Sequence, residues 1–424
     1  MVAKGQLPAD LELPDFGRSA AVCARLGACR ETPSLVHPGN LHWAVRSFQT
    51  ESYQPHENHY GIMQFNKFNL SKIIHSAAPE ICMDVAAWAR ERGMRIQILQ
   101  PSILPDVDFL AADDPMGRKT IAAHINAIAR DQTLVPIEKA VIRDEDGLVE
   151  LPDGKICYEG NWWLPYLTSS WSYKKRFEWR RRHLRGDFYS LLCLWGETYF
   201  HWFHDVLPRL FTALPHLPED TRFLINENPK EFQVLTLKAL GVSEDRLEFQ
   251  PARMNTRVDR LWFATPLGHS GLTSPVVLKK VVQQIRTCLL PEASSARAAR
   301  LWVSRAKATG RRIRNEKDLA GILGEFAVEM IFAEDLSFLH QLEIFARASM
   351  VIGPHGAGLT NSFFCEEGTK VCEIAIDGVP PCYLLACRGL HLDFTRIMAK
   401  SLELDHNADM ELERSHLTDY LSRK

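Results

Sequence analysis

The chain lacks the sequence features that mark membrane, secreted and disordered proteins. No run of about 18 apolar residues is present to span a bilayer, and residues 1–30 contain no apolar signal-peptide core. The 10 cysteines form no C-x-x-C pair and most lie in apolar segments, which favours reduced thiols and a cytoplasmic chain. With 46% apolar and 24% charged residues, the 424-residue chain has the composition of a folded protein of several domains.

An excess of charge of one sign is also lacking. Lys and Arg total 50 against 52 Asp and Glu, which gives a net charge of −2, so we expect no nucleic-acid partner. A local excess occurs in Lys174–Arg185, where basic residues are interleaved with Phe177, Trp179 and His183. A solvated connector is the favoured interpretation of this run. The alternative is docking on an anionic surface, including peripheral contact with the inner membrane.

Helix-like and strand-like patterns divide the chain into regions. Apolar residues recur at near-helical spacing from Ser71 to Arg92, and the stretch from Leu134 to Tyr158 predicts short strands joined by turns. Further along, strands alternate with helices in two successive series, separated by a Pro/Ser/Ala-rich linker. The expected regions are an N-terminal extension of unknown role (1–130), a small β-containing module with the basic connector (131–185), the two α/β series (186–296 and 297–400) and a helical C-terminal tail (401–424).

Two successive α/β series predict an α/β fold with two Rossmann-like domains facing a cleft. Ligands in such sheets bind at the carboxyl ends of the strands. Residues that directly follow a predicted strand are therefore the first candidates for binding and catalysis.

A glycine turn in Met350–Phe364 is the strongest local pattern. An apolar strand runs into Pro354-His355-Gly356-Ala357-Gly358 and then into a helix, so backbone N–H groups are expected to point outward unpaired. The glycines allow a ligand to approach the backbone, and His355 supplies a further donor. We interpret the segment as a phosphate site. The alternative is an ordinary strand–helix turn with a packed histidine.

Arginines cluster in Val303–Glu316. Arg305 ends a predicted strand in the same series as the glycine turn, and Arg311, Arg312 and Arg314 follow it. Arginines at strand ends can bind a pyrophosphate through paired N–H groups. A solvated basic loop is the alternative, but the occurrence of both features in one predicted domain favours the phosphate interpretation.

A candidate base lies in the segment His201-Trp202-Phe203-His204-Asp205. In a helix, His201 and Asp205 share one face at i and i+4, where a carboxylate can orient an imidazole. Pro208 removes the backbone hydrogen bond to residue 204, so the helix must kink or begin here. His204 is the competing base, and a structural histidine beside a helix terminus is the alternative for the whole group.

We expect no metal centre. Asp106-Val107-Asp108 has the D-x-D pattern by which some sugar-nucleotide enzymes hold Mg²⁺ or Mn²⁺, but it follows Pro105 and lies outside both α/β series. The chain has no H-E-x-x-H, no cysteine quartet and no Walker pattern. Zinc hydrolysis and ATP binding therefore have no support.

Four segments together resemble glycosyltransferase family 61. They are FHWFHDVLPRL, WVSRAKATGRRIRNE, EDLSFLHQLEIFARASMVIGPHGAGLTN and EEGTKVCEI, in that order. The resemblance covers about 134–376 and is most specific in its last third. It implies a GT-B architecture, with an acceptor-side domain at 186–296 and a nucleotide-sugar-binding domain at 297–400.

The resemblance also implies which residues form the site. His201 and Asp205 fall on the H-W-x-x-D positions of the family, whereas His204 occupies a position that is usually apolar. The implied donor-binding residues are Arg305 and Arg311 on the S-R and R-R positions, His355, Gly356, Ala357, Gly358 and Asn361 in and after the H-G-A-G turn, and Glu373 where related folds hold a ribose.

The reaction implied by the resemblance is an inverting, metal-independent transfer that uses no cofactor. The donor is a nucleotide-diphosphate sugar, with a UDP-sugar favoured, and the acceptor is a hydroxyl of a glycan or glycoconjugate. His201 or Asp205 would act as the base, while Arg305, Arg311 and the 355–358 turn would stabilise the departing diphosphate. The alternatives are a nucleotide-sugar epimerase of the same fold and a non-catalytic carbohydrate- or nucleotide-binding protein. The sequence leaves the donor sugar, the acceptor and the oligomeric state open.

Overall fold

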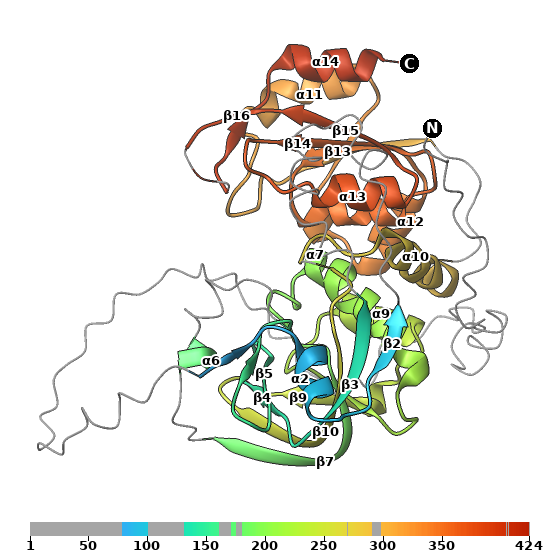
Figure 1. Cartoon of the computed structure of the whole chain (residues 1–424). Helices are drawn as coiled ribbons and strands as arrows, with labels where there is room; N and C mark the ends of the chain where they lie inside the picture. Colours follow the sequence, from blue (N-terminus) through green and yellow to red (C-terminus); the bar gives the residue numbers. More distant parts are fainter. Residues whose placement is uncertain are drawn as a thin grey trace, which may run out of the picture. The chain divides into compact units, whose positions relative to one another are not determined.

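The structure is a computed structural model, and it describes residues 79–100, 131–160, 171–174, 180–268, 270–290, 298–403, 405 and 407–423. These residues belong to one compact unit, Pro79–Lys424. Their strands form a 10-stranded mixed sheet, a 5-stranded parallel sheet and a short two-stranded ribbon (Figure 1).

The mixed sheet has the order β1-β6-β5-β4-β10-β7-β8-β9, with β3 pairing with β10 and β2 with β3. Strands β10, β7, β8 and β9 are parallel, whereas β3 and β4 are antiparallel to β10. The strands are β1 (Ile81–Cys82), β2 (Gln97–Gln100), β3 (Gln132–Glu138), β4 (Val141–Arg143), β5 (Leu148–Glu150), β6 (Ile156–Cys157), β7 (Arg181–Ser190), β8 (Arg222–Asn226), β9 (Leu247–Gln250) and β10 (Asn255–Ala264).

The predicted hairpins between 134 and 158 are present, but the structure differs from the predicted domain boundary at residue 185. Strands β3 and β4 pair with β10 from the following region, so the predicted β module continues the sheet of the first α/β series. The boundary itself falls inside β7. Sequence periodicity did not reveal this arrangement because it identifies strands and gives no information on their partners.

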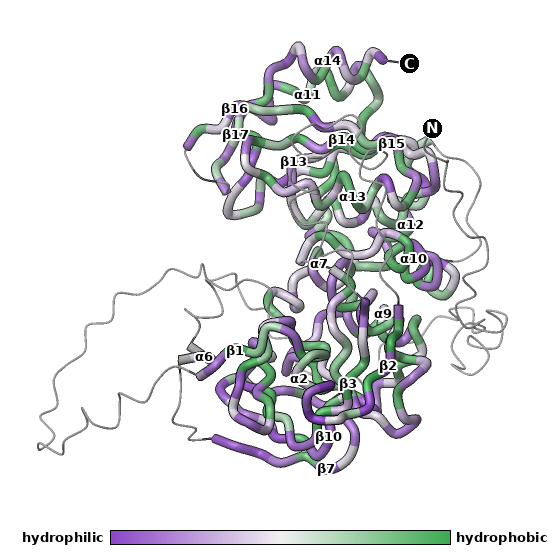
Figure 2. Tube along the Cα trace, viewed as in Figure 1, coloured by the Kyte–Doolittle hydropathy of each residue, from purple (hydrophilic) through white to green (hydrophobic). Residues whose placement is uncertain are grey.

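The prediction of a connector is wrong for the last part of the basic run. Arg181–Arg185 forms the first half of β7, while residues 175–179 lie outside the described residues. Figure 2 shows this start of β7 as hydrophilic. An ion pair stabilises the strand there. Arg182 donates to Glu248 on β9 over 2.7 Å. The prediction of a connector treated a run of basic residues as a loop, but a strand with one face in solvent can also carry arginines.

Helices cover both faces of the mixed sheet. Helix α2 packs on one face, and α8 and α9 pack on the other. The predicted helix from Ser71 to Arg92 is wrong for Ile81–Asp84, because the chain forms β1 there and Asp84 caps α2 by accepting a hydrogen bond from the Ala87 N–H over 2.7 Å. The helices of this half are α2 (Val85–Glu91), α6 (Trp171–Lys174), α7 (Tyr199–His201), the π-helical turn η2 (Trp202–Val206), α8 (Leu207–Ala213), η3 (Leu214–His216), α9 (Glu231–Ala239) and η4 (Glu244–Arg246).

The second sheet has the order β12-β11-β13-β14-β15 and is parallel throughout. Its strands are β11 (Ala299–Val303), β12 (Glu329–Ile331), β13 (Ala348–Pro354), β14 (Lys370–Ala375) and β15 (Asp393–Met398). Ser337 caps α12, since its hydroxyl accepts a hydrogen bond from the His340 N–H over 3.3 Å. The helices are α10 (Pro275–Leu289), α11 (Glu316–Glu325), η5 (Ala333–Asp335), α12 (Phe338–Ala346), η6 (Ala357–Phe364), α13 (Cys382–Gly389) and α14 (Arg414–Ser422).

The expected C-terminal tail is part of the second half. It forms a short ribbon, β16 (Lys400–Ser401) and β17 (Met410–Glu411), followed by α14. Leu417 and Leu421 of α14 are buried with Trp302 and Ile352 of the parallel sheet, on the face that α11 also covers (Figure 1).

One continuous apolar cluster links the two sheets. It includes residues of α8 and α9 beside the mixed sheet and of α12 and α13 beside the parallel sheet. Helix α10 contacts α8, α9, α13 and η6. A mixed α/β architecture with parallel strands in both sheets is therefore confirmed. Within the described ranges, no helix has both the length and the apolar character needed to cross a bilayer.

Candidate functional site

The kink predicted at Pro208 occurs as a widened helical turn. Proline has no N–H to bond residue 204, and the preceding Leu207 N–H bonds the carbonyl of Trp202, five residues back. The resulting π turn runs directly after His201. It contains both His204 and Asp205, so the three candidate side chains of this segment lie within one distorted stretch of helix.

The Asp205 carboxylate accepts four hydrogen bonds. Oδ2 accepts from His201 Nδ1 over 2.7 Å and from the Ser270 hydroxyl over 2.8 Å. Oδ1 accepts from His204 Nδ1 and from the Gly271 N–H, each over 3.1 Å. Two donors come from the helix and two from the loop that precedes α10.

These contacts decide what Asp205 can do chemically. Burial raises the pKa of this carboxyl, but the hydrogen bonds from His201 and His204 outweigh burial and hold the pKa well below its usual range. A carboxylate that is ionised and surrounded by donors is a poor proton acceptor. Because it can only accept, both imidazoles must carry a proton on Nδ1. Nε2 of His201 is the ring nitrogen that does not contact Asp205, which is the geometry of an aspartate that orients a histidine.

Ser270 and Gly271 were missed by the sequence analysis. Gly271 has φ +79°, a conformation that L side chains rarely adopt, and this turn places its N–H on Asp205. The loop carries no recognisable motif, and its contact with Asp205 spans 66 residues of sequence. No local pattern in the sequence could have identified it.

The second candidate centre lies where β13 ends. A Cβ added to Gly356 would lie 2.0 Å from Nη1 and 2.5 Å from Cζ of Arg305, so the guanidinium packs directly against this glycine. The segment after it, η6, is a 3₁₀ helix, and its first N–H groups at Ala357 and Gly358 have no carbonyl within the helix to bond. The His355 N–H is already bonded to the Ile374 carbonyl over 2.8 Å.

Arg305 and Arg311 form no ion pair with an acidic side chain among the described residues. Their Nε atoms are buried and unbonded within that part of the chain. Arg305 makes one contact to a carbonyl, from Nη2 to Gly310 over 3.1 Å. Burial, and then the nearby charge of Arg311, lower the pKa of Arg305. Two uncompensated guanidiniums beside a glycine turn attract an anion.

The neighbouring arginines of the same loop are different. Arg312 and Arg314 both pair with Asp409, over 2.8 and 2.6 Å. The loop therefore separates into two arginines that hold the C-terminal ribbon and two that remain available to a ligand.

Glu373, which the resemblance implies for the ribose, is paired with two side chains of the protein. Its side chain is fully buried; Oε1 contacts His355 Nδ1 at 2.5 Å and Oε2 accepts from Arg396 Nε over 2.8 Å. Burial raises the pKa of this carboxyl, but His355 and Arg396 outweigh it and lower the pKa below its usual value. Glu373 lies on β14, and the residue opposite it on β15 is Arg396. Arg396 holds one carboxylate oxygen, and the other oxygen positions His355.

Asn361 likewise bonds to protein rather than facing a ligand. It is fully buried, its Oδ1 accepts from the Tyr199 hydroxyl over 2.5 Å, and its Nδ2 donates to Gln341 over 2.7 Å. Tyr199 begins the helix that carries His201. Asn361 thus joins that helix to η6, which follows the glycine turn.

Aromatic rings connect the two centres. Phe200 stacks on His204 with 4.8 Å between centroids and meets the ring of Tyr383 at 5.2 Å. The Tyr383 hydroxyl donates to the carbonyl of Gly356 over 2.7 Å. The His201–Asp205 pair and the glycine turn therefore lie on either side of one packed pair of rings.

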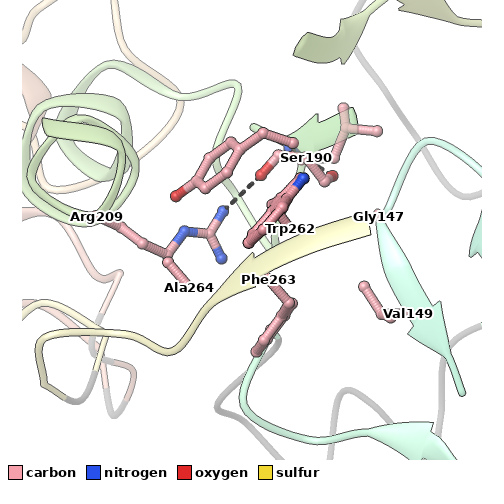
Figure 3. A pocket seen from close by; sticks show the side chains of 10 residues that line it. Gly147, Val149, Ser190, Arg209, Trp262, Phe263 and Ala264 are labelled. Atoms are coloured by element: carbon pink, nitrogen blue, oxygen red, sulfur yellow. Dashed lines mark hydrogen bonds between the residues drawn. The ribbon is translucent and has the colours of Figure 1, made fainter. Parts of the chain in front are cut away.

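A small cavity lies beside Arg209, one helical turn after Asp205 (Figure 3). The Arg209 guanidinium donates to the Ser190 carbonyl over 3.0 Å, and Tyr189 and Trp262 line the same space. Its volume of about 10 Å³ accommodates roughly one water molecule. A sugar ring does not fit there.

Metal ligands do not gather in the described part of the chain. No group of three or more His, Cys, Asp or Glu side chains there could hold an ion. Asp106 and Asp108 lie outside the described residues. The eight cysteines that the structure describes are all free thiols, six of them buried.

Comparison with known proteins gives one family. The model of the family described as Glycosyltransferase 61 matches residues 199–372, a range that contains His201, Asp205, Arg305, Arg311 and the glycine turn. No curated protein matches the chain.

Proposed function

Because residues 199–372 belong to glycosyltransferase family 61, the chain is a glycosyltransferase, and we propose that its donor is a nucleotide-diphosphate sugar. A UDP-sugar is the favoured donor, and the acceptor is a hydroxyl of a glycan or glycoconjugate. The transfer inverts the anomeric carbon and uses neither metal nor cofactor. In this proposal the two sheets form the two halves of a GT-B enzyme, with the acceptor beside the mixed sheet and the donor beside the parallel sheet.

The observation that carries the donor assignment is the pair of unpaired arginines. Arg305 and Arg311 follow β11, at the carboxyl edge of a parallel sheet where such folds bind ligands. A diphosphate carries the charge and the oxygen geometry that two guanidiniums accept. Gly356 leaves room for the Arg305 guanidinium, and the N–H groups that begin η6 add further donors.

The proposed chemistry uses the two centres on opposite sides of the anomeric carbon. Nε2 of His201 removes the proton from the acceptor hydroxyl, whose oxygen forms a bond to the anomeric carbon. The bond from that carbon to the diphosphate oxygen breaks, and the nucleoside diphosphate leaves with the electron pair. Asp205 stabilises the imidazolium, while Arg305 and Arg311 neutralise the charge on the leaving group.

An exposed aromatic side chain stands on the acceptor side of this arrangement. The Trp195 indole is 38% exposed, and its ring centroid lies 5.3 Å from that of His201. An indole face beside the base offers the apolar surface on which a sugar ring can stack.

Replacing Arg305 tests the donor site. Arg305→Met is expected to weaken UDP binding about 10- to 150-fold, since hydrogen bonds to a charged group contribute about 1.5–3 kcal/mol. Isothermal titration calorimetry measures this affinity. The matched control is Arg312→Met in the same loop, which should leave UDP affinity unchanged because Arg312 pairs with Asp409. Equal affinities for wild type and Arg305→Met would refute the donor assignment.

Metal independence is tested by chelation. Transfer activity is expected to survive EDTA, because the charge of the leaving group falls on Arg305 and Arg311. Activity that disappears in EDTA and returns with Mn²⁺ would contradict this, and would direct attention to Asp106 and Asp108.

An epimerase of the same fold would process the donor alone. Product analysis with and without a panel of glycan acceptors distinguishes the two reactions. Consumption of the donor that depends on an acceptor supports transfer, whereas interconversion of the nucleotide sugar without an acceptor supports epimerisation.

A further inference from the structure

His204 is a buried histidine to which the reaction above gives no role. Its side chain is fully buried, and Nδ1 contacts Asp205 Oδ1 at 3.1 Å. Nε2 is also buried and has no partner among the described residues. The ring stacks on Phe200, and the Phe363 centroid lies 6.3 Å away. A buried nitrogen without a hydrogen-bond partner costs free energy, so its presence calls for an explanation. The Nδ1 contact with Asp205 is the polar interaction that this ring makes.

The hydrogen bonds to Asp205 show what that contact achieves. Each carboxylate oxygen receives one imidazole and one donor from the loop before α10. The His204 bond fixes Oδ1, and a carboxylate with one fixed oxygen presents the other in a defined direction. That other oxygen, Oδ2, is the one that holds His201.

We propose that His204 is a positioning residue that fixes the Asp205 carboxylate and thereby orients His201 for proton transfer. The inference rests on the proposed function, because it concerns the same base. His204 cannot itself be that base, since Nδ1 contacts Asp205 and Nε2 is buried.

Three further titratable groups lie around Asp205. Arg209 on α8, Cys193 after β7 and Cys382 on α13 interact electrostatically with this carboxylate. None of the three forms a hydrogen bond to it within the described residues. A change at His204 therefore leaves their contributions in place.

The test compares two substitutions by NMR titration of the full-length, ¹⁵N-histidine-labelled protein. His204→Asn places an amide N–H where Nδ1 was, whereas His204→Phe keeps the stacked ring and removes the donor. In His204→Phe the negative charge of Asp205 is less neutralised, so the titration midpoint of the His201 resonance should move to higher pH by on the order of half a unit. His204→Asn should restore the wild-type midpoint. His340→Asn, at an exposed position of α12, is the control.

The kinetic arm uses a nucleotide sugar and an acceptor that give turnover in the product analysis with the glycan panel. His204→Phe should lower kcat about tenfold or more, shift the acid limb of the pH profile in the same direction and leave UDP affinity unchanged. His204→Asn should recover most of the loss. A midpoint that is unchanged in His204→Phe, or equal shifts in both variants, would overturn the proposal.

Wild-type protein gives an independent check if His204→Phe does not fold. Long-range ¹H–¹⁵N spectra should show a proton on Nδ1 of His204, the nitrogen that faces Asp205. The opposite tautomer cannot donate to Asp205 and would overturn the positioning role. These NMR results do not depend on turnover, so failure to find sugar transfer would count against the proposed function alone.

Discussion

His201→Asn is expected to lower kcat for sugar transfer about 10²- to 10⁴-fold, the usual contribution of general-base assistance. Asparagine can still place an N–H near Asp205, but it has no equivalent of Nε2 to accept the hydroxyl proton. The affinity for UDP should stay within a factor of two or so of wild type, because the arginines and the glycine turn are not changed. Initial rates and calorimetry on the same preparation measure both quantities.

Asp205→Asn separates the roles within the pair. The amide of the asparagine can face His201 with a donor instead of an acceptor, which favours the wrong tautomer of the imidazole. We therefore expect kcat to fall severely while the affinity for UDP is retained. His340→Asn serves again as the control, and its kcat should equal that of wild type. If His201→Asn kept near-normal kcat, the base would have to be sought outside the pair.

The His201–Asp205 contact was predictable from sequence because it is local. Four residues of helix bring the two side chains together, and the i,i+4 rule survives the π turn at Pro208. The segment did not reveal which residue is the base. That depends on Ser270 and Gly271, which come from a distant loop and leave Asp205 without a free oxygen.

Glu373 and Asn361 show what inference from motifs leaves out, namely the protein partners of a residue. Asn361 lies within the matched range 199–372 and Glu373 directly follows it. Both are fully buried and bonded to other side chains. Strand periodicity gave the position of Glu373 on a buried strand but not the identity of the neighbouring strand, β15, which supplies Arg396. The parallel strands and helices of 299–375 were predicted well because each has its own local pattern. Pairing between distant strands has none, and the predicted boundary at residue 185 failed for that reason.

Glu373→Gln is expected to destabilise the protein by about 3–5 kcal/mol, the usual cost of removing one partner of a buried ion pair. The substitution removes the negative charge beside Arg396 and His355, which are both nearly buried, and replaces one of the two acceptor oxygens with an NH₂ donor. Urea denaturation followed by circular dichroism measures the loss. Glu411→Gln, at an exposed position of β17, is the control and should change the free energy of unfolding by less than about 0.5 kcal/mol.

The pH dependence of this loss follows from the direction of the carboxyl's shift. The pKa of Glu373 is lower in the folded protein than the usual value for a glutamate. Its contribution to stability is therefore fully present above the pKa of the unfolded chain and declines as the pH falls toward the folded value. The difference between wild type and Glu373→Gln should be largest near neutral pH and should shrink in acid. A difference that stayed constant from neutral to acid would mean that the cost lies in packing, and that the charge of Glu373 does not hold His355 beside the glycine turn.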